Sequence, residues 1–169
     1  MAGEIVVGNE ATDRTAAVGS EQTTVNKDNP ASVSGSIKTV KIYTLTAMKN
    51  VKVATFFVVS GNNLSTRAVA TIADGQVTAG YSEHIVDIEI QSGDFIGYCG
   101  TTDNASGIMD TDTSGGNGVW NTSGLHIPCT NLAFTLFSVW KLSLQGIGDT
   151  PALAAGGTPV LALLNSGVL

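Results

Sequence analysis

The residues with the clearest potential for chemistry form a short acidic run at positions 110–115. Asp110, Asp112 and Ser114 place oxygen ligands at alternate positions, and a glycine follows them, as in the first half of a calcium-binding loop. The position that should close such a loop with a bidentate glutamate is occupied by Asn121. The run therefore predicts either a calcium site or an ordinary solvated loop, and we expect no other cofactor.

A second group of residues suggests sugar binding. Trp120, Asn121 and His126 lie just after a polar loop rich in Gly, Ser, Asn and Asp. A lectin-like sandwich could stack a sugar ring on the tryptophan and hold its hydroxyl groups with the amide and the loop. The alternative is that Trp120 caps the end of a hydrophobic core, because a large amphipathic ring suits that position too. Both readings stay open at this point.

Residues for catalysis are harder to assemble from the sequence. A hydrolase needs a nucleophile, a base and a group that orients the base. His84 and His126 are the two histidines, and neither a GxSxG nor an HExxH motif is present. Paired carboxylates for glycoside cleavage have no signal either. We therefore expect no catalytic residue and no enzyme, and we interpret His84 as a core or boundary histidine.

Two cysteines, Cys99 and Cys129, could form at most one internal disulfide bond. Their spacing does not match the CxxC pattern of zinc sites. Half-buried free thiols are the first interpretation, and a single disulfide bond is the alternative.

The elements that would position these residues are strands. At positions 83–91, His84, Val86, Ile88 and Ile90 alternate with polar residues, which is the period of a strand with one buried face and one solvated face. A Ser-Gly-Asp turn follows at 92–94, and a second strand begins at Phe95. These residues predict a strand of a half-solvated antiparallel sheet, a turn and the start of a second strand.

Other strands follow the same logic, with turns every 8 to 12 residues or so. The run at 51–59 is almost continuously apolar and β-branched or aromatic, so we expect it to be covered on both faces. Eight to ten such strands predict an all-β protein, an antiparallel β-sandwich of jelly-roll type with extended N- and C-terminal arms. The main further strands are expected at 36–46, 64–72 and 132–144.

Composition divides the chain into three parts. Residues 1–34 are rich in small and polar residues and predict an N-terminal arm or loop with a short strand at 4–7, and residues 35–148 form the sandwich. Residues 149–169 form an apolar C-terminal extension, broken by Gly and Pro. This extension either folds back on its own domain or docks on another copy, and we expect docking. The residues expected to mediate it are Pro151, Leu153, Val160, Leu161, Leu163 and Leu164.

The overall composition excludes several partners. Charged residues make up only 13% of the 169 residues, and the formal net charge is −6. Eight basic residues cannot build a stripe along a phosphate backbone, so we expect no nucleic-acid partner. An anionic membrane would repel the chain, and no apolar run is long enough to span a bilayer. The N-terminus lacks the features of a secretory signal, which is consistent with synthesis in a host cytoplasm.

Several segments together resemble a group of β-rich proteins of phage, prophage and environmental viral genomes. They lie at residues 7–14, 29–44, 52–58, 90–100, 114–120 and 127–131, so that the resemblance runs from about Val6 to Gly148. It implies a virion accessory protein, such as a capsid decoration protein or a head or tail fibre domain. The expected partners are copies of itself and capsid or tail proteins, and the expected location is the virion. A carbohydrate-binding, lectin-like module is the alternative function.

Overall fold

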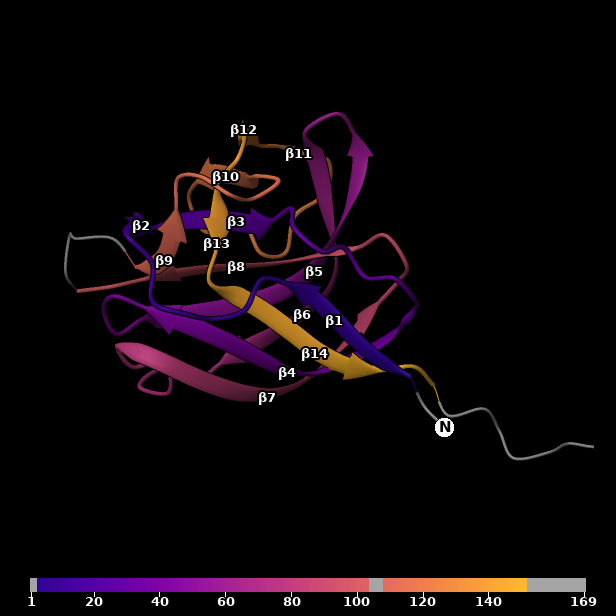
Figure 1. Ribbon diagram of the computed structural model, residues 1–169, viewed down its shortest axis with the longest axis horizontal. Coiled ribbons are helices and arrows are strands. Elements are labelled where there is room, and N and C mark those ends of the chain that lie inside the picture. The colour runs from indigo at the N-terminus through magenta and orange to yellow at the C-terminus, as the bar shows by residue number, and fades with distance from the viewer. Residues whose placement is uncertain (1–2, 104–107, 152–169) are drawn as a thin grey trace, which may run out of the picture.

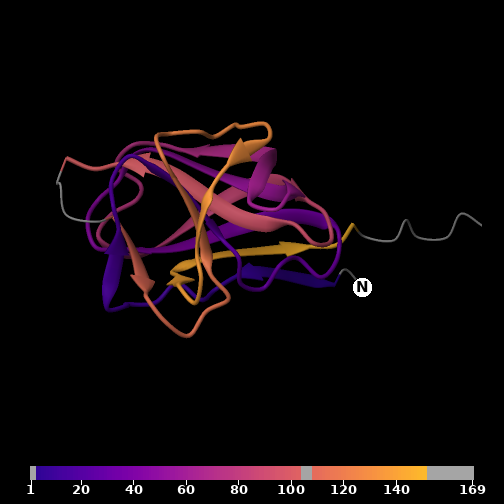
Figure 2. The same ribbon diagram turned by 90° about the horizontal axis from the view of Figure 1, so that it is seen from above.

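The computed structural model of the protein describes residues 3–103 and 108–151, which contain fourteen strands and no helix (Figure 1). Every strand pairing is antiparallel, and the strands form two sheets that pack face to face. The prediction of an all-β antiparallel sandwich is therefore confirmed. In Figure 2 the two sheets are seen from above as separate layers, with the indigo β1 and the yellow β14 side by side in the lower one.

The first sheet has four main strands. Their order is β1 (Glu4–Gly8), β14 (Leu144–Asp149), β4 (Gly35–Thr44) and β7 (Gly80–Ile90). Beyond the end of β4 the sheet continues in β9 (Met109–Asp112), which β2 (Ala16–Val18) and β13 (Lys141–Leu142) flank.

The second sheet has seven strands in one path. Their order is β11 (Leu132–Ala133), β6 (Asn63–Ile72), β5 (Lys49–Ser60), β8 (Phe95–Thr101), β3 (Gln22–Asn26), β10 (Val119–Ser123) and β12 (Thr135–Phe137). The long central strands of this sheet, β5 and β8, pair with each other over most of their length.

The order of the eight main strands is that of a jelly roll. Four antiparallel pairs, β1 with β14, β3 with β8, β4 with β7 and β5 with β6, are nested along the chain from its ends toward its middle. Folding this nested ribbon over itself yields the sheet orders β1-β14-β4-β7 and β3-β8-β5-β6, which are those observed. Strands β9 to β13 are an insertion between β8 and β14. The expected jelly-roll character is thus present in the strand order itself.

Two hydrophobic cores stabilise this arrangement. The larger one lies between the sheets and takes Val51 and Val53 from β5. A second core covers the other face of the second sheet and takes Ala54 and Phe56 from the same strand. The two sets point to opposite faces because successive side chains alternate along a strand. The expectation that the run at 51–59 is covered on both faces is confirmed for Val53 to Phe56. Side chains from the segment 124–136 cover the outer face of the second sheet there.

The expected alternation is present in β7, but β7 and β8 lie in different sheets, so the turn between them connects the two layers. Along β7 the buried residues are His84, Val86, Ile88 and Ile90, and the residues between them are exposed. Gly93, with φ of +90°, forms the turn to β8, a backbone conformation that glycine adopts without strain. Ile85 departs from the expected pattern, because it is apolar and yet 87% exposed.

The expected short strand near the N-terminus is present as β1, but residues 3–34 also contribute β2 and β3 to the sandwich and are not an arm. The strand β3 lies between β8 and β10, near the middle of the second sheet, and Val25 is completely buried. Polar composition concealed this strand because its buried polar residues are paired. Asn26 donates from Nδ2 to the carbonyls of Leu142 and Leu144, across the space between the sheets, and its Oδ1 accepts from Asn9. Paired amides of this kind can be buried without the usual penalty.

The expected long strand at 132–144 is wrong as well. The chain forms the short strands β11 and β12 in one sheet and then crosses to β13 in the other. Val139 marks the crossing with a φ of +64°, which is unusual for a β-branched residue. The long final strand is β14, whose inward positions include Gly146 and Gly148. A Cβ at Gly148 would lie 2.0 Å from the carbonyl oxygen of Ser36 on the neighbouring strand β4, so this position has no room for a side chain.

Candidate functional site

Both ends of the described chain meet at one end of the sandwich (Figure 1). β1 and β14 pair in register from Glu4 opposite Asp149 to Gly8 opposite Gln145. Beyond this ladder, Thr150 donates its N–H to the carbonyl of Gly3 at 2.9 Å, and Gly3 donates its own N–H to Thr150 Oγ1 at 2.7 Å. The described chain therefore ends at a residue that directly follows this pairing, and β14 itself lies between β1 and β4.

The first residue of the expected assembly segment, Pro151, is exposed at this end. Proline fixes its own φ and disfavours a helical conformation of the preceding residue, so the chain continues in an extended direction past Thr150. The other residues of that expectation, Leu153, Val160, Leu161, Leu163 and Leu164, lie outside the described residues.

The expected calcium ligands lie largely on a strand. Asp110 and Asp112 belong to β9, while Ser114 lies in the exposed loop after it. Arg14 occupies both carboxylates, because its N–H donates to Asp110 Oδ2 at 3.2 Å and its guanidinium pairs with Asp112 Oδ2 at 2.9 Å. The expectation of a loop was wrong for the two aspartates. Across residues 3–103 and 108–151, no three or more His, Cys, Asp or Glu side chains are grouped to hold a metal ion.

The two aspartates differ in their electrostatics. Burial raises the pKa of Asp110, since its carboxylate loses solvent. The N–H of Thr15 donates to Asp112 and, together with Arg14, lowers the pKa of that carboxyl. Both carboxylates thus fasten the segment before β2 to the strand β9 on which they lie.

The expected sugar-stacking residue has no exposed ring face. Trp120 is 3% exposed, its ring packs edge-on against Phe95 with 5.0 Å between centroids, and its Nε1 donates to Asn62 Oδ1 at 2.9 Å. It belongs to the second core, so the sugar-stacking interpretation of this residue is wrong and the capping interpretation holds. Asn121 lies beside it on β10 but its side chain points to Gln22 and Thr24, to which its Nδ2 donates.

His126 does not join these residues in a common site. It is exposed, and its Nε2 lies 2.8 Å from the carbonyl oxygen of Ser123 within the same turn. Asn121 instead lines a hollow of about 170 Å³ together with Gln22, Phe137 and Trp140. The rings of Phe137 and Trp140 are stacked there, with centroids 4.5 Å apart. The sequence did not single out this pair, which comes together only because the chain crosses between sheets at Val139.

His84 is buried on the inner face of β7, as expected, and its Nε2 lies 2.9 Å from Ser82 Oγ. Burial lowers the pKa of its imidazole. It borders a hollow of about 360 Å³ between β6 and β7, which Thr71, Gln76 and Ile85 also line. A base would need a nucleophile within hydrogen-bonding reach, and the described neighbour of His84 is the hydroxyl of Ser82 on its own strand.

Both cysteines are free thiols, so the first interpretation of them is confirmed. Cys99 is buried in the second core, and Cys129 packs against the same core from the segment that covers it. Burial raises the pKa of each thiol. Both are therefore protonated at neutral pH and behave as small apolar side chains.

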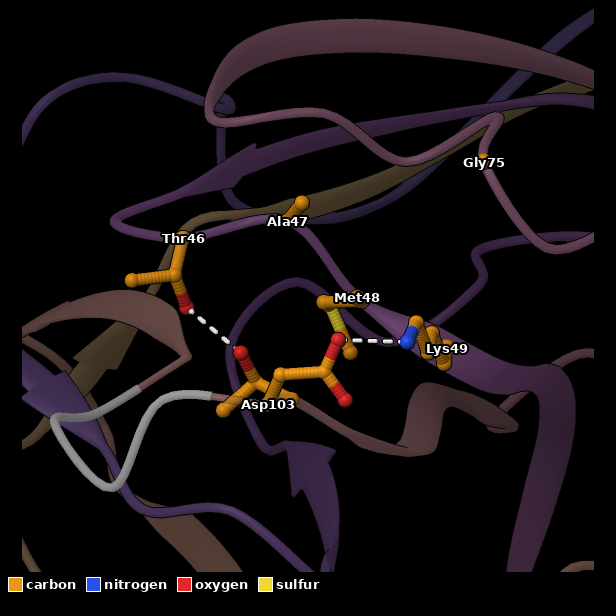
Figure 3. A pocket seen from close by; sticks show the side chains of 7 residues that line it. Thr46, Ala47, Met48, Lys49, Gly75 and Asp103 are labelled. Atoms are coloured by element: carbon orange, nitrogen blue, oxygen red, sulfur yellow. Dashed lines mark hydrogen bonds and ion pairs between the residues drawn. The ribbon is translucent and has the colours of Figure 1, made fainter.

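A further hollow of about 290 Å³ lies at the end of the sandwich where β4 turns into β5 (Figure 3). Met48 forms its floor, and Lys49 and Asp103 form an ion pair across one side. Both charged side chains are at least half exposed, so water screens the pair and it contributes little to stability.

Two buried polar groups that the sequence did not reveal are structural. Asp94 is almost completely buried and accepts from both Nε and NH2 of Arg67, whose guanidinium also lies 4.8 Å from the ring centre of Phe57. Asp28 accepts from Asn9 Nδ2 and from the N–H of Asn117, each at 2.7 Å. The first pair links β6 to the β7–β8 turn, and the second group links the N-terminal segment to the loop before β10.

Comparisons of the chain with protein-family models, curated proteins and solved structures find no match. In the part of the chain that the structure describes, no helix is long and apolar enough to cross a membrane.

Proposed function

We propose that this chain is a non-enzymatic structural protein of a virus particle, of the capsid decoration or fibre type. It assembles with copies of itself, and with capsid or tail proteins, through its C-terminal segment. The observation that carries the proposal is that an apolar segment leaves a jelly-roll sandwich from a pinned strand end, where Gly3 and Thr150 are paired. Jelly rolls are common in viral capsid and lectin domains, which supports the proposal without establishing it.

The energetics favour docking of this segment. Residues 152–169 include five leucines and two valines and no charged side chain. Burying one such side chain stabilises by about 1.5–3 kcal/mol relative to leaving it in water. Burial of several of them against another subunit would offset part of the free energy that association costs through lost entropy. An assembly of this kind also explains a surface with few charges, because neighbouring copies cover part of it.

The polar groups inside the sandwich support a scaffold role. Asp94 holds Arg67, Asp28 holds the N-terminal segment, and Asp110 and Asp112 hold Arg14. Each of these carboxylates is directed to a neighbouring strand or loop of the protein itself. These hydrogen bonds and ion pairs hold the loops in place, as expected for a protein whose role is to form part of the surface of a virus particle.

The proposal is tested by removing residues 152–169 and comparing masses by light scattering. The cut leaves Thr150 and Pro151 in place, so the β1–β14 ladder and the Gly3 pairing are retained. We expect the full chain, of 17.3 kDa per copy, to form a discrete oligomer and the shortened, lighter chain to be a monomer with unchanged circular dichroism. A shortened chain that assembles as the full chain does would refute the role of the segment.

Carbohydrate binding is the second candidate, and one observation favours it. The stacked Phe137 and Trp140 lie beside the amides of Gln22 and Asn121 in the hollow of about 170 Å³. Aromatic rings next to amide groups suit a sugar, which presents one apolar face and a rim of hydroxyl groups. A glycan array with the wild type and with Asn121→Asp and Trp140→Phe variants tests it, and absence of binding by the wild type would end this candidacy.

A further inference from the structure

The outer face of the first sheet carries an apolar row that nothing in the described chain covers. Val6 on β1 lies opposite Ile147 on β14, Ile147 lies opposite Thr39 on β4, and Thr39 lies opposite Ile85 on β7. Directly opposed residues of antiparallel strands point to the same face. The row therefore crosses all four strands, over about 14 Å at the usual strand spacing. We call these four residues the outer row.

The exposure of the outer row is unusual for its residue types. Ile85 is 87% exposed and Val6 is 41% exposed, while Ile147 and Thr39 are partly exposed. Single exposed apolar residues are normal, but here three apolar residues and the threonine between two of them lie in register across the sheet and form a continuous strip. An isoleucine on this face lowers solubility, and it does not contribute to the core, which lies on the other side of the sheet.

Charged pairs border the strip on both sides. Lys41 lies 3.9 Å from Glu83 on one side, and Lys38 lies 2.6 Å from Asp87 on the other. An apolar centre with a polar rim is the common layout of a protein interface. Beyond Ile85 the strip ends at the hollow of about 360 Å³ between β6 and β7, which offers depth for a side chain.

The length and position of the C-terminal segment make it the fitting occupant. Residues 152–169 are eighteen residues, which could extend to about 60 Å, far more than the width of the strip. They carry no charge, so they match the apolar strip without meeting a like charge in its rim. Only Thr150 and Pro151 separate them from β14, which belongs to the sheet that bears the strip.

The direction of departure favours a second copy over the same chain. Thr150 is held in line with β14 by its two hydrogen bonds to Gly3, and Pro151 favours an extended conformation of Thr150. Ile147 of the outer row lies behind this exit point along the strand. To reach its own strip the segment would have to reverse direction, whereas a neighbouring copy placed at this end of the sandwich receives it directly.

We propose that the outer row, Val6, Ile147, Thr39 and Ile85, is the docking surface for residues 152–169 of a neighbouring copy. This inference rests on the proposed assembly through the C-terminal segment and names the surface that receives it. A reciprocal exchange of two segments would close a dimer, and a one-way exchange would close a ring.

The first test measures the mass of full-length variants by light scattering over a range of concentrations. Ile85→Glu places a charge at the β7 end of the strip, on its most exposed residue, where folding does not depend on the side chain. Val59→Glu is the matched control, because Val59 is 47% exposed on β5 of the other sheet and the change in charge is the same. We expect Ile85→Glu to weaken assembly at least about tenfold, a 1.4 kcal/mol effect, and Val59→Glu to leave it unchanged.

The second test identifies the contact and its direction. A chain carrying Ile85→Cys is mixed with a chain carrying Leu161→Cys under mild oxidation. We expect a disulfide-linked pair in the mixture, and not when either chain is mixed with wild type, whose own thiols are buried or half-buried. A chain that carries both changes and closes the bond only within itself would show docking on its own strip and overturn the exchange between copies.

The outcomes separate this inference from the proposed function. If removal of residues 152–169 dissociates the oligomer while Ile85→Glu does not, the segment binds elsewhere and the outer row is refuted, with the assembly role intact. If the full chain is a monomer at every concentration, both proposals fail together.

Discussion

Gly3 and Thr150 exchange two hydrogen bonds, one from each backbone N–H, at 2.7 Å and 2.9 Å. This contact joins residues 147 positions apart and closes the outermost of the four nested strand pairs. It sets both the place and the direction in which the C-terminal segment leaves the sandwich. The assembly that we propose depends on this geometry, because a loosely attached segment would lose more entropy on docking than one already held at its base.

Replacing Thr150 with valine removes the acceptor for the Gly3 N–H and keeps a β-branched side chain in the ladder. We expect faster hydrogen exchange at the Gly3 amide and a loss of about 0.5–1.5 kcal/mol in the free energy of unfolding. Thr113→Val, in the exposed loop after β9, is the control and should change neither quantity. Unchanged protection of Gly3 in Thr150→Val would contradict the pairing.

The buried pair of Arg67 and Asp94 predicts a large and specific loss of stability. Arg67→Met leaves the Asp94 carboxylate, which is 3% exposed, without its cation, and such a loss costs about 3–5 kcal/mol. Lys38→Met removes one partner of an exposed pair and should cost less than about 1 kcal/mol. Urea unfolding of both variants measures the difference. Equal effects would mean that Asp94 is not shielded from water.

His84 predicts a specific dependence of stability on pH. Burial lowers its pKa in the folded protein, so the unfolded chain binds the proton more readily, with a pKa of about 6.5. The contribution of His84 to the free energy of unfolding is therefore fully present above that value. It is lost as the pH falls toward the lower pKa of the folded state. Between pH 7.5 and pH 5.5 the wild type should lose more stability than His84→Gln. Parallel urea-unfolding results for the two proteins would contradict this assignment.

The free thiols predict slow chemical modification. Burial raises the pKa of Cys99 and of Cys129, so little thiolate forms at pH 7.5. We expect iodoacetamide to modify Cys129 at least about tenfold more slowly than a small free thiol, and Cys99 more slowly still. In urea both should react at the rate of the free thiol. Rapid reaction of Cys99 in the folded protein would show that the second core opens readily.

The sequence revealed the fold where the side chains alternate regularly. β7 was predictable because its buried residues repeat every second position, and β5 because its apolar run needs cover on both faces. β3 was not predictable, because Thr23, Thr24 and Asn26 are buried through hydrogen bonds to distant residues. β14 was concealed because glycines occupy inward positions where a strand pattern would show apolar residues, and at Gly148 the carbonyl oxygen of Ser36 leaves no room for a side chain.

The candidate sites were less predictable than the fold. Asp110 and Asp112 share the spacing of a calcium loop, yet the spacing of a strand also repeats every second residue, and β9 uses both for Arg14. Trp120 is adjacent in sequence to a polar loop but faces the core. The outer row combines residues of four strands that lie far apart along the chain, so the sequence does not show that they are neighbours. Only Ile85 indicates an exposed apolar surface, because it lies among the polar residues of its strand.

The mass of the full chain in solution is the most direct test of this account. Light scattering from the untagged protein, over a hundredfold range of concentration, should yield a discrete oligomer whose mass is a whole multiple of 17.3 kDa. A particle of 17.3 kDa at every concentration would mean that the chain does not associate with itself, and the proposed assembly would be refuted.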